Sequence, residues 1–323
     1  MGHHHLTPSE RESVMCLRHD GCGIREIARK LGRSPSTISR ELARNEIHKG
    51  SYSAIKAQER YRQRRIRCRP KEKLTDEGTR GRLLHYLEEG WSPEQIVGRL
   101  KRTGGKELGV SVPTIYRAFT RGLLPREATA CLRRKAKPYR KKMGPVNGRG
   151  HIRDAVSIES RPEGARRREE IGHWEGDTVL GRQGTGGIVT LVERKSRYSL
   201  MKKIENKTAE MTTGAIVSLF SGVAPEALKT LTLDNGKEFS GHKEISRMAG
   251  LPVYFAHPGC PGERGTNENT NGLVREYLPK GLDFGEVQDE TVQFIEARLN
   301  SRPRKCLDFL TPAEVFFANW CCI

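Results

Sequence analysis

The stretch GHWEGDTVLG at 172–181 opens the run of short apolar segments that decides the fold class of this chain. GIVTLVE at 187–193 and YSLMKKI at 198–204 follow it as two further predicted strands. A predicted helix over 208–220 and predicted strands over 231–234 and 252–257 complete the pattern. Three strands in series, followed by alternation of helix and strand, predict an α/β domain with a mixed sheet.

Two aspartates stand out against this strand pattern. Asp177 lies within an otherwise apolar strand, where an unpaired carboxylate is costly. Asp234 directly follows a short apolar strand, a usual position for a functional group at the edge of a sheet. Two carboxylates at one end of a sheet repel each other unless a cation lies between them, and hard oxygen ligands select magnesium or manganese. Taken singly, Asp234 also fits a turn and Asp177 also fits a satisfied buried carboxylate.

The positive charge of the chain is concentrated in its first half. The 323 residues carry a formal net charge of +19, and residues 1–150 hold 35 Lys and Arg against 15 Asp and Glu. A local excess of this size favours a nucleic-acid-binding module over a generally basic surface. No stretch has the length and apolarity of a membrane-spanning helix, and the cysteines have no paired spacing. We therefore expect a cytoplasmic, nucleoid-associated protein with reduced thiols and no membrane partner.

Residues 24–44 have the pattern of a helix-turn-helix. A short helix over 24–31 ends at a Gly-Arg break, after which Ser34 caps and Pro35 begins a second helix that buries Ile38 and Leu42. The outward side chains of this second helix, which we expect to contact DNA, are Ser36, Thr37, Arg40 and Arg44. An ordinary helical hairpin with a solvated face is the alternative interpretation.

A second helical unit follows. Ser92, Pro93 and Gln95 form a predicted capping box, and 111–119 predicts another capped helix that buries Ile115 and Phe119. From this helix we expect Thr114 and Arg117 to contact DNA. Arginine- and lysine-rich segments over 60–69 and 133–142 indicate linkers that gain order on phosphates. The expected organisation is therefore a helix-turn-helix domain 1–50, a basic linker 51–75, a second helix-turn-helix-like domain 76–125, a basic linker 126–150 and an α/β domain 151–323.

Three longer motifs resemble the catalytic blocks of transposases of the insertion sequence 30 family. They are HWEGD at 173–177, LDNGKEF at 233–239 and ERGTNENTNGL at 263–273. The opening over 27–42 and the ending over 300–314 are similar too, so the resemblance runs from about residue 6 to residue 317. One departure lies in the stretch 257–264, which lacks the aromatic residue that family members usually carry before Glu/Gln-Arg-Gly.

The resemblance implies a ribonuclease-H-like catalytic domain with an Asp-Asp-Glu triad. Asp177, Asp234 and Glu268 match the three acids, with 33 residues between the last two. These carboxylates would hold two magnesium or manganese ions for metal-assisted phosphoryl transfer. The implied partners are double-stranded DNA, as terminal inverted repeats and as target, and further copies of the chain in the complex that pairs the ends. Two alternatives remain: a helix-turn-helix regulator without catalysis, and a metal nuclease of the same fold that only hydrolyses.

The choice of the third carboxylate also rests on helix geometry, since Glu263 and Glu276 lie nearby. With Thr266 as N-cap of a helix to about residue 278, the apolar side chains face the core and Glu268 lies opposite them. The side chains that share its face are Asn271, Gly272 and Arg275, and we expect Arg275 to contact a phosphate. A carboxylate in the first turn also stabilises a helix through its dipole, which is the alternative role for Glu268.

Overall fold

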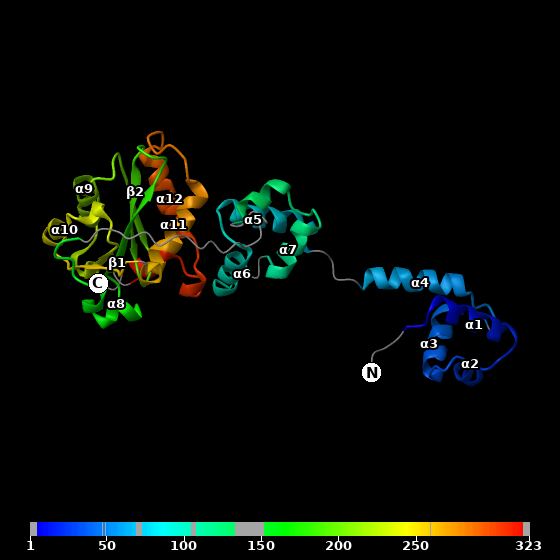
Figure 1. The fold of residues 1–323 in the computed structure, drawn as a ribbon. Helices are drawn as coiled ribbons and strands as arrows, with labels where there is room; N and C mark the ends of the chain where they lie inside the picture. Colours follow the sequence, from blue (N-terminus) through cyan, green and yellow to red (C-terminus); the bar gives the residue numbers. More distant parts are fainter. Residues whose placement is uncertain are drawn as a thin grey trace. The chain divides into compact units, whose positions relative to one another are not determined.

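The computed structural model describes residues 5–68, 73–104, 108–132 and 152–318, apart from Ile47, Lys49 and Gly259. It divides into two compact units, Met1–Glu72 and Lys73–Ile323, which are described separately (Figure 1). Within the described ranges, no helix combines the length and the apolarity needed to cross a membrane. The predicted basic segment 133–142 lies outside the described residues.

The first unit is a small all-helical domain. Its helices are α1 (Pro8–His19), α2 (Ile24–Lys30), α3 (Pro35–Asn45) and α4 (Ala54–Arg67). As predicted, Ser34 begins α3, because its side chain accepts a hydrogen bond from the Thr37 amide at 3.2 Å. Ile27 and Ile38 are fully buried in the shared core, so α2 and α3 pack as the predicted helix-turn-helix.

Helix α4 differs from the sequence-based expectation, which placed a basic linker over 51–75. Residues 54–67 form a helix because Ser53 caps it and because Ala54 and Ala57 pack into the core of the unit. On the docked side Gln58 also accepts a hydrogen bond from Arg11 at 2.7 Å, while most arginines of this helix remain exposed. Arginine is itself a good helix former, so a high charge density did not prevent regular structure here.

The second unit begins with another helical module. It contains α5 (Glu77–Glu88), α6 (Pro93–Arg102) and α7 (Val112–Thr120), flanked by the short 3-10 turns η1 (Lys73–Thr75) and η2 (Arg126–Cys131). The predicted capping box is present, because Ser92 and Gln95 bond each other's backbone amides. Ile115 is fully buried as predicted, whereas Phe119 is only half-buried and Ala118 takes the inner position on α7.

The rest of the second unit is built on a five-stranded sheet. Its strands are β1 (His173–Leu180), β2 (Gly187–Glu193), β3 (Ser199–Ile204), β4 (Thr230–Leu233) and β5 (Val253–Phe255). They lie in the order β3-β2-β1-β4-β5, with β1, β2 and β3 antiparallel and β1, β4 and β5 parallel. The predicted mixed sheet is confirmed, and its order and directions are those of the ribonuclease-H-like fold.

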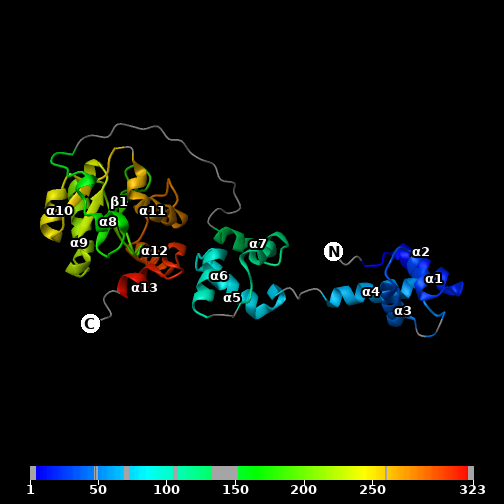
Figure 2. The same cartoon turned by 90° about the horizontal axis from the view of Figure 1, so that it is seen from below.

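Helices cover both faces of this sheet (Figure 2). Helices α9 (Ala209–Phe220) and α10 (His242–Ala249) lie on one face, and α11 (Gly265–Tyr277) and α12 (Asp289–Ser301) on the other. Trp174 on β1 points into the apolar layer under α9, while its neighbours Glu175 and Asp177 point to the α11 face. The remaining short elements are η3 (Ile158–Ser160), α8 (Glu163–Arg167), η4 (Pro225–Ala227), η5 (Lys237–Phe239), η6 (Pro261–Arg264), η7 (Lys305–Leu307) and α13 (Pro312–Phe317).

Helix α11 starts earlier than the sequence suggested. Its first residue is Gly265, so Thr266 is not its N-cap. The preceding turn η6 leads directly into the helix, and Thr266 accepts hydrogen bonds from Arg197 and Arg168 at 2.7 and 3.4 Å. The Thr266 hydroxyl, which the sequence predicted to cap the helix, therefore accepts hydrogen bonds from arginines outside the helix.

Polar contacts join α6 to the end of the chain within the second unit. The Gln95 side-chain amide donates to the Pro303 carbonyl at 2.6 Å, and Arg99 forms a two-pronged ion pair with Glu314. Further ion pairs of this joint are Lys305–Glu94, Arg102–Asp308 and Arg298–Glu89. The helical module is therefore bonded to the sheet domain by charged side chains of α6.

Candidate functional site

The two predicted catalytic aspartates lie side by side on neighbouring strands. In the parallel ladder between β1 and β4, Glu175 pairs with Thr232. Asp177 and Asp234 each follow two residues later and so face the same side of the sheet. The structure brings these two carboxylates together as the sequence predicted.

A cation from the protein itself holds the pair. Nη1 of Arg264 is 3.5 Å from Oδ2 of Asp177, and Nη2 is 3.3 Å from Oδ2 of Asp234. The same guanidinium donates to the Gly176 carbonyl at 3.0 Å. Arg264 therefore supplies the positive charge that two adjacent carboxylates need.

The surroundings of Asp177 disfavour its ionised form. Burial raises the pKa of this carboxyl, and the nearby carboxylates Asp234 and Glu238 raise it further. Arg264 and the Thr178 amide, which donates to Oδ1 at 2.8 Å, act in the opposite direction. The net pKa is above its usual value, so the site gains from additional positive charge.

Helix α11 closes the other side of the site with two asparagines one turn apart. Asn271 donates from Nδ2 to Oδ2 of Asp177 at 2.9 Å and accepts from the Thr190 hydroxyl at 3.0 Å. Asn267, which is fully buried, donates its backbone amide to the Glu175 carboxylate at 2.9 Å. These bonds fix α11 across β1 and β2 and orient the Asp177 carboxylate.

Glu268, the third predicted carboxylate, lies in the first turn of α11. The apolar side of the helix is as predicted, because Leu273 and Val274 are buried, and the Glu268 side chain is exposed. It lies three residues before Asn271, which makes the two side chains neighbours on one flank. Within the described part of the chain, no three acidic, histidine or cysteine side chains are grouped as a metal site. The structure thus joins Asp177 to Asp234 and leaves Glu268 on the adjoining flank.

Several contacts of this site were not found from the sequence, although Asn271 was expected on the same helix face as Glu268. Asn267 and Asn271 offered a signal, since polar residues four apart share a helix face. The buried ion pair between Glu175 and Arg194 offered none, because its partners are separated along the chain and meet only across strands. Arg264 was likewise invisible as a partner of the aspartates, since it lies in the turn η6 before the helix.

The Arg275 side chain is hydrogen-bonded to the protein backbone. It donates to the Leu180 carbonyl at 2.6 Å and to the Leu278 carbonyl at 3.4 Å, so it ties α11 to the end of β1. Burial lowers the pKa of its guanidinium. A phosphate contact by Arg275 stays a prediction.

The predicted DNA-contacting side chains of the two helical modules share a local pattern. Thr37-Ile38-Ser39-Arg40 on α3 corresponds to Thr114-Ile115-Tyr116-Arg117 on α7. In both, the isoleucine is fully buried and the arginine is exposed. Each arginine donates from Nε to the carbonyl four residues earlier, at 3.0 Å on α3 and 3.3 Å on α7. Ser36 and Arg44 on α3 are also exposed, and Thr37 and Thr114 are half-buried.

Comparison with known proteins identifies relatives along nearly the whole chain. A helix-turn-helix domain model matches residues 3–45. The chain is 39% identical over 316 residues to the transposase of insertion sequence element IS1086 of Cupriavidus metallidurans, covering 96% of this chain and 93% of that protein. It is 38% identical over 325 residues to the transposase of element IS30A of Escherichia coli, covering 96% and 83%.

Among solved structures, the catalytic core domain of BIV integrase matches 47% of this chain and 97% of its own, with a TM-score of 0.37 and 19% identity. That structural likeness is weak, and the fold assignment rests on the strand order described above. The sequence relatives are decisive, because identity above 30% extends over most of both chains. The chain therefore belongs to the IS30 family of insertion-sequence transposases.

Proposed function

We propose that this transposase binds the terminal inverted repeats of its element and cuts and joins DNA at Asp177, Asp234 and Glu268. The single observation that supports this most strongly is the pair of adjacent carboxylates bridged by Arg264. A partly buried acid pair that already binds a cationic group is a suitable platform for divalent cations. The oxygen donors match the preference of Mg²⁺ or Mn²⁺, and we infer two ions.

The protein side of this mechanism follows from the contacts around the pair. Asp177 and Asp234 would hold the cations, with Asn271 fixing the direction of the Asp177 carboxylate. Bound divalent cations supply Lewis-acid activation of water and of the phosphodiester. Arg264 would release the aspartates at that point, because its guanidinium lies between them. Glu268 would complete the set from the first turn of α11, one helical turn before Asn271.

DNA binding itself follows from the helix-turn-helix domain and the family. We infer that Ser36, Thr37, Arg40 and Arg44 contact the repeat, with Thr114 and Arg117 as a second contact and Arg275 near the cut strand. Joining two ends to a target needs more than one active site, so we propose a homo-oligomer in the synaptic complex. We infer that the protein acts on double-stranded DNA and is located in the cytoplasm, associated with the nucleoid.

The test combines labelled element ends with Mg²⁺ and separates cutting from joining. Asp177→Asn, Asp234→Asn and Glu268→Gln should each lower the cleavage rate by orders of magnitude, because each ligand supports several kcal/mol of transition-state stabilisation. End binding without divalent cations should stay near wild type. Glu276→Gln serves as the control, because Glu276 pairs with Arg302 at 3.2 Å and lies outside the aspartate pair.

Pre-cut ends with target DNA then distinguish a transposase mechanism from hydrolysis alone. Joined products are expected from the unmodified protein and not from the three variants. Comparable cleavage by Glu268→Gln would remove Glu268 from the triad. Strong activity in excess chelator would overturn the cation mechanism.

A further inference from the structure

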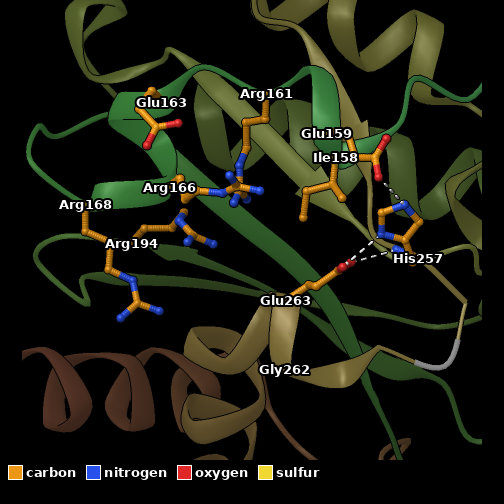
Figure 3. Close-up of a pocket in the computed structure, with 10 residues that line it drawn as sticks. All are labelled: Ile158, Glu159, Arg161, Glu163, Arg166, Arg168, Arg194, His257, Gly262 and Glu263. Atoms are coloured by element: carbon orange, nitrogen blue, oxygen red, sulfur yellow. Dashed lines mark hydrogen bonds and ion pairs between the residues drawn. The ribbon is translucent and has the colours of Figure 1, made fainter.

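An arginine-lined cavity opens on the sheet domain. Its volume is about 350 Å³, and one side of it is formed by Arg161, Arg166, Arg168 and Arg194 (Figure 3). The opposite side carries Glu159, Glu263 and His257. These side chains come from the segment around α8, from the turn after β2 and from the turn before α11.

The carboxylates that line the cavity are bonded to other side chains, and Glu163 on the arginine side pairs with Arg167 at 3.1 Å. Glu263 is bonded to His257, with Oε1 2.8 Å from Nδ1, and Glu159 lies 3.5 Å from Nε2 of the same ring. Arg194 is committed to the buried Glu175. In the described ranges of the chain, Arg161, Arg166 and Arg168 form no ion pair with any carboxylate. Three guanidinium groups therefore share one wall with no carboxylate of the described residues at ion-pair distance, and Glu175 and Glu263 act on Arg161 only from further away.

Partial burial of Arg161 and the crowding of like charges disfavour this arrangement without an anion. The Nε of Arg161 is buried and has no hydrogen-bond partner. Burial lowers the pKa of the Arg161 and Arg168 guanidinium groups, and Arg197 and Arg194 lower that of Arg168 further. A bound anion would satisfy the free donor and offset the repulsion.

Arg168 of the cavity and its neighbour Arg197 have an unusual backbone conformation. Arg168 and Arg197 have φ values of +59° and +65°, a left-handed region that non-glycine residues seldom adopt. Both donate to the hydroxyl of Thr266 on α11. Local strain of this kind persists where surrounding contacts impose it, and it is common at binding sites.

The cavity lies beside the carboxylate site, because Glu263 lines it and the next residue, Arg264, bonds both aspartates. Arg161 donates to the Thr232 hydroxyl at 3.1 Å, and Thr232 pairs with Glu175 in the β1–β4 ladder. Asp234 and Asp177 follow two residues later on the same face, which is about 7 Å along a strand. That distance is about the spacing of neighbouring phosphates along one DNA strand, which exceeds the rise of ~3.4 Å per nucleotide along the helix axis.

We propose that this cavity is a phosphate subsite that holds the backbone of the DNA strand being cut, one or two nucleotides from the phosphodiester at Asp177 and Asp234. The assignment rests on the proposed function for the identity of the strand. Guanidinium groups suit this role because their donors match phosphate oxygens in pairs. The subsite fixes the position of the strand without reading its sequence.

The test measures binding separately from catalysis. The full chain carrying Asp177→Asn is titrated, without divalent cations, with a fluorescent duplex that ends in the terminal repeat, over a series of salt concentrations. Arg166→Ala and Arg161→Ala should each reduce the salt slope of log Kd by about 0.9 per lost phosphate contact. Arg167→Ala is the matched control, because this neighbour on α8 is paired with Glu163 at 3.1 Å.

A methylphosphonate, which removes the charge of one phosphate, then locates the contact. Placed one or two nucleotides from the cut, it should weaken binding by the protein that retains Arg166 and leave binding by Arg166→Ala unchanged. Equal salt slopes for Arg166→Ala, Arg161→Ala and Arg167→Ala would overturn the subsite. The subsite would also be overturned if the methylphosphonate weakened binding equally in the protein that retains Arg166 and in Arg166→Ala, wherever it is placed in the strand. Cleavage by the protein with Asp177 intact is measured in parallel, so failure of the proposed function would be recognised separately.

Discussion

The two helical modules present the same short pattern on their exposed helices but differ in what their arginines do. On α3, Arg40 and Arg44 are exposed, and α3 belongs to a unit with its own core. On α6 of the second module, Arg99 and Arg102 form ion pairs with Glu314 and Asp308 at the end of the chain. Part of the positive charge that indicated DNA binding is therefore used to attach the second module to the sheet domain. Charge density alone does not separate these two uses.

The largest expected effect comes from deleting the first module. A chain of residues 73–323 should lose specific binding to the terminal repeat by about a thousandfold or more, which is the usual margin between specific and non-specific binding. The measurement is fluorescence anisotropy with the repeat and with an unrelated duplex of equal length. Unchanged preference for the repeat would show that the second module alone reads the sequence.

Single substitutions compare the two exposed helices directly. Arg40→Ala and Arg117→Ala should each weaken specific binding by about 1–3 kcal/mol if both arginines read base edges. Binding to an unrelated duplex should change far less in both cases. If only Arg40→Ala lowers the affinity for the repeat, the shared pattern on α7 is a packing feature and the second module is a spacer.

The charged joint between α6 and the chain end should behave as a protein contact. Arg99→Glu should lower the free energy of unfolding of the second unit by up to about 1 kcal/mol, since partly exposed ion pairs contribute little. Affinity for DNA should fall only slightly. The double variant Arg99→Glu with Glu314→Arg should restore the stability seen in calorimetry, and lack of any restoration would show that the two side chains are not coupled.

The smallest effect is expected on thermal stability, at the aspartate pair, because the negative charge of the two carboxylates is only partly compensated by Arg264. Burial raises the pKa of Asp177 above its usual value of 3.8. The stability that this carboxyl contributes is therefore fully present below pH 3.8 and is lost as pH rises through the raised pKa. Without divalent cations, Asp177→Asn should therefore have a slightly higher Tm than the unmodified protein at pH 7. The two should converge below pH 3.8.

Added Mg²⁺ or Mn²⁺ should reverse this order, because cations stabilise only the protein that keeps its ligands. A lower Tm for Asp177→Asn at pH 7 in chelator would contradict the prediction that the ionised Asp177 carboxylate destabilises the fold. It would show instead that the ion pair between Arg264 and Asp177 outweighs the cost of burying the carboxylate.

Local sequence determined the elements that depend on local chemistry. Ser34 and Ser92 begin their helices because capping needs only neighbours within three residues. The short apolar run around Asp177 predicted a strand, and the period of two in strands puts its carboxylate on the same face as Glu175. The strand series likewise predicted a mixed sheet, and the family motifs supplied its topology.

Tertiary structure decided which distant side chains meet. Helix α4 formed within a predicted linker because Ala54 and Ala57 pack into the core of the first unit. The local charge pattern gives no sign of this packing. Arg264 reached both aspartates only because the turn before α11 lies against the end of β1 and β4. The arginine cavity likewise combines residues from three separate segments. Such contacts depend on the packing of α11 and α8 against the sheet, which no spacing along the chain encodes.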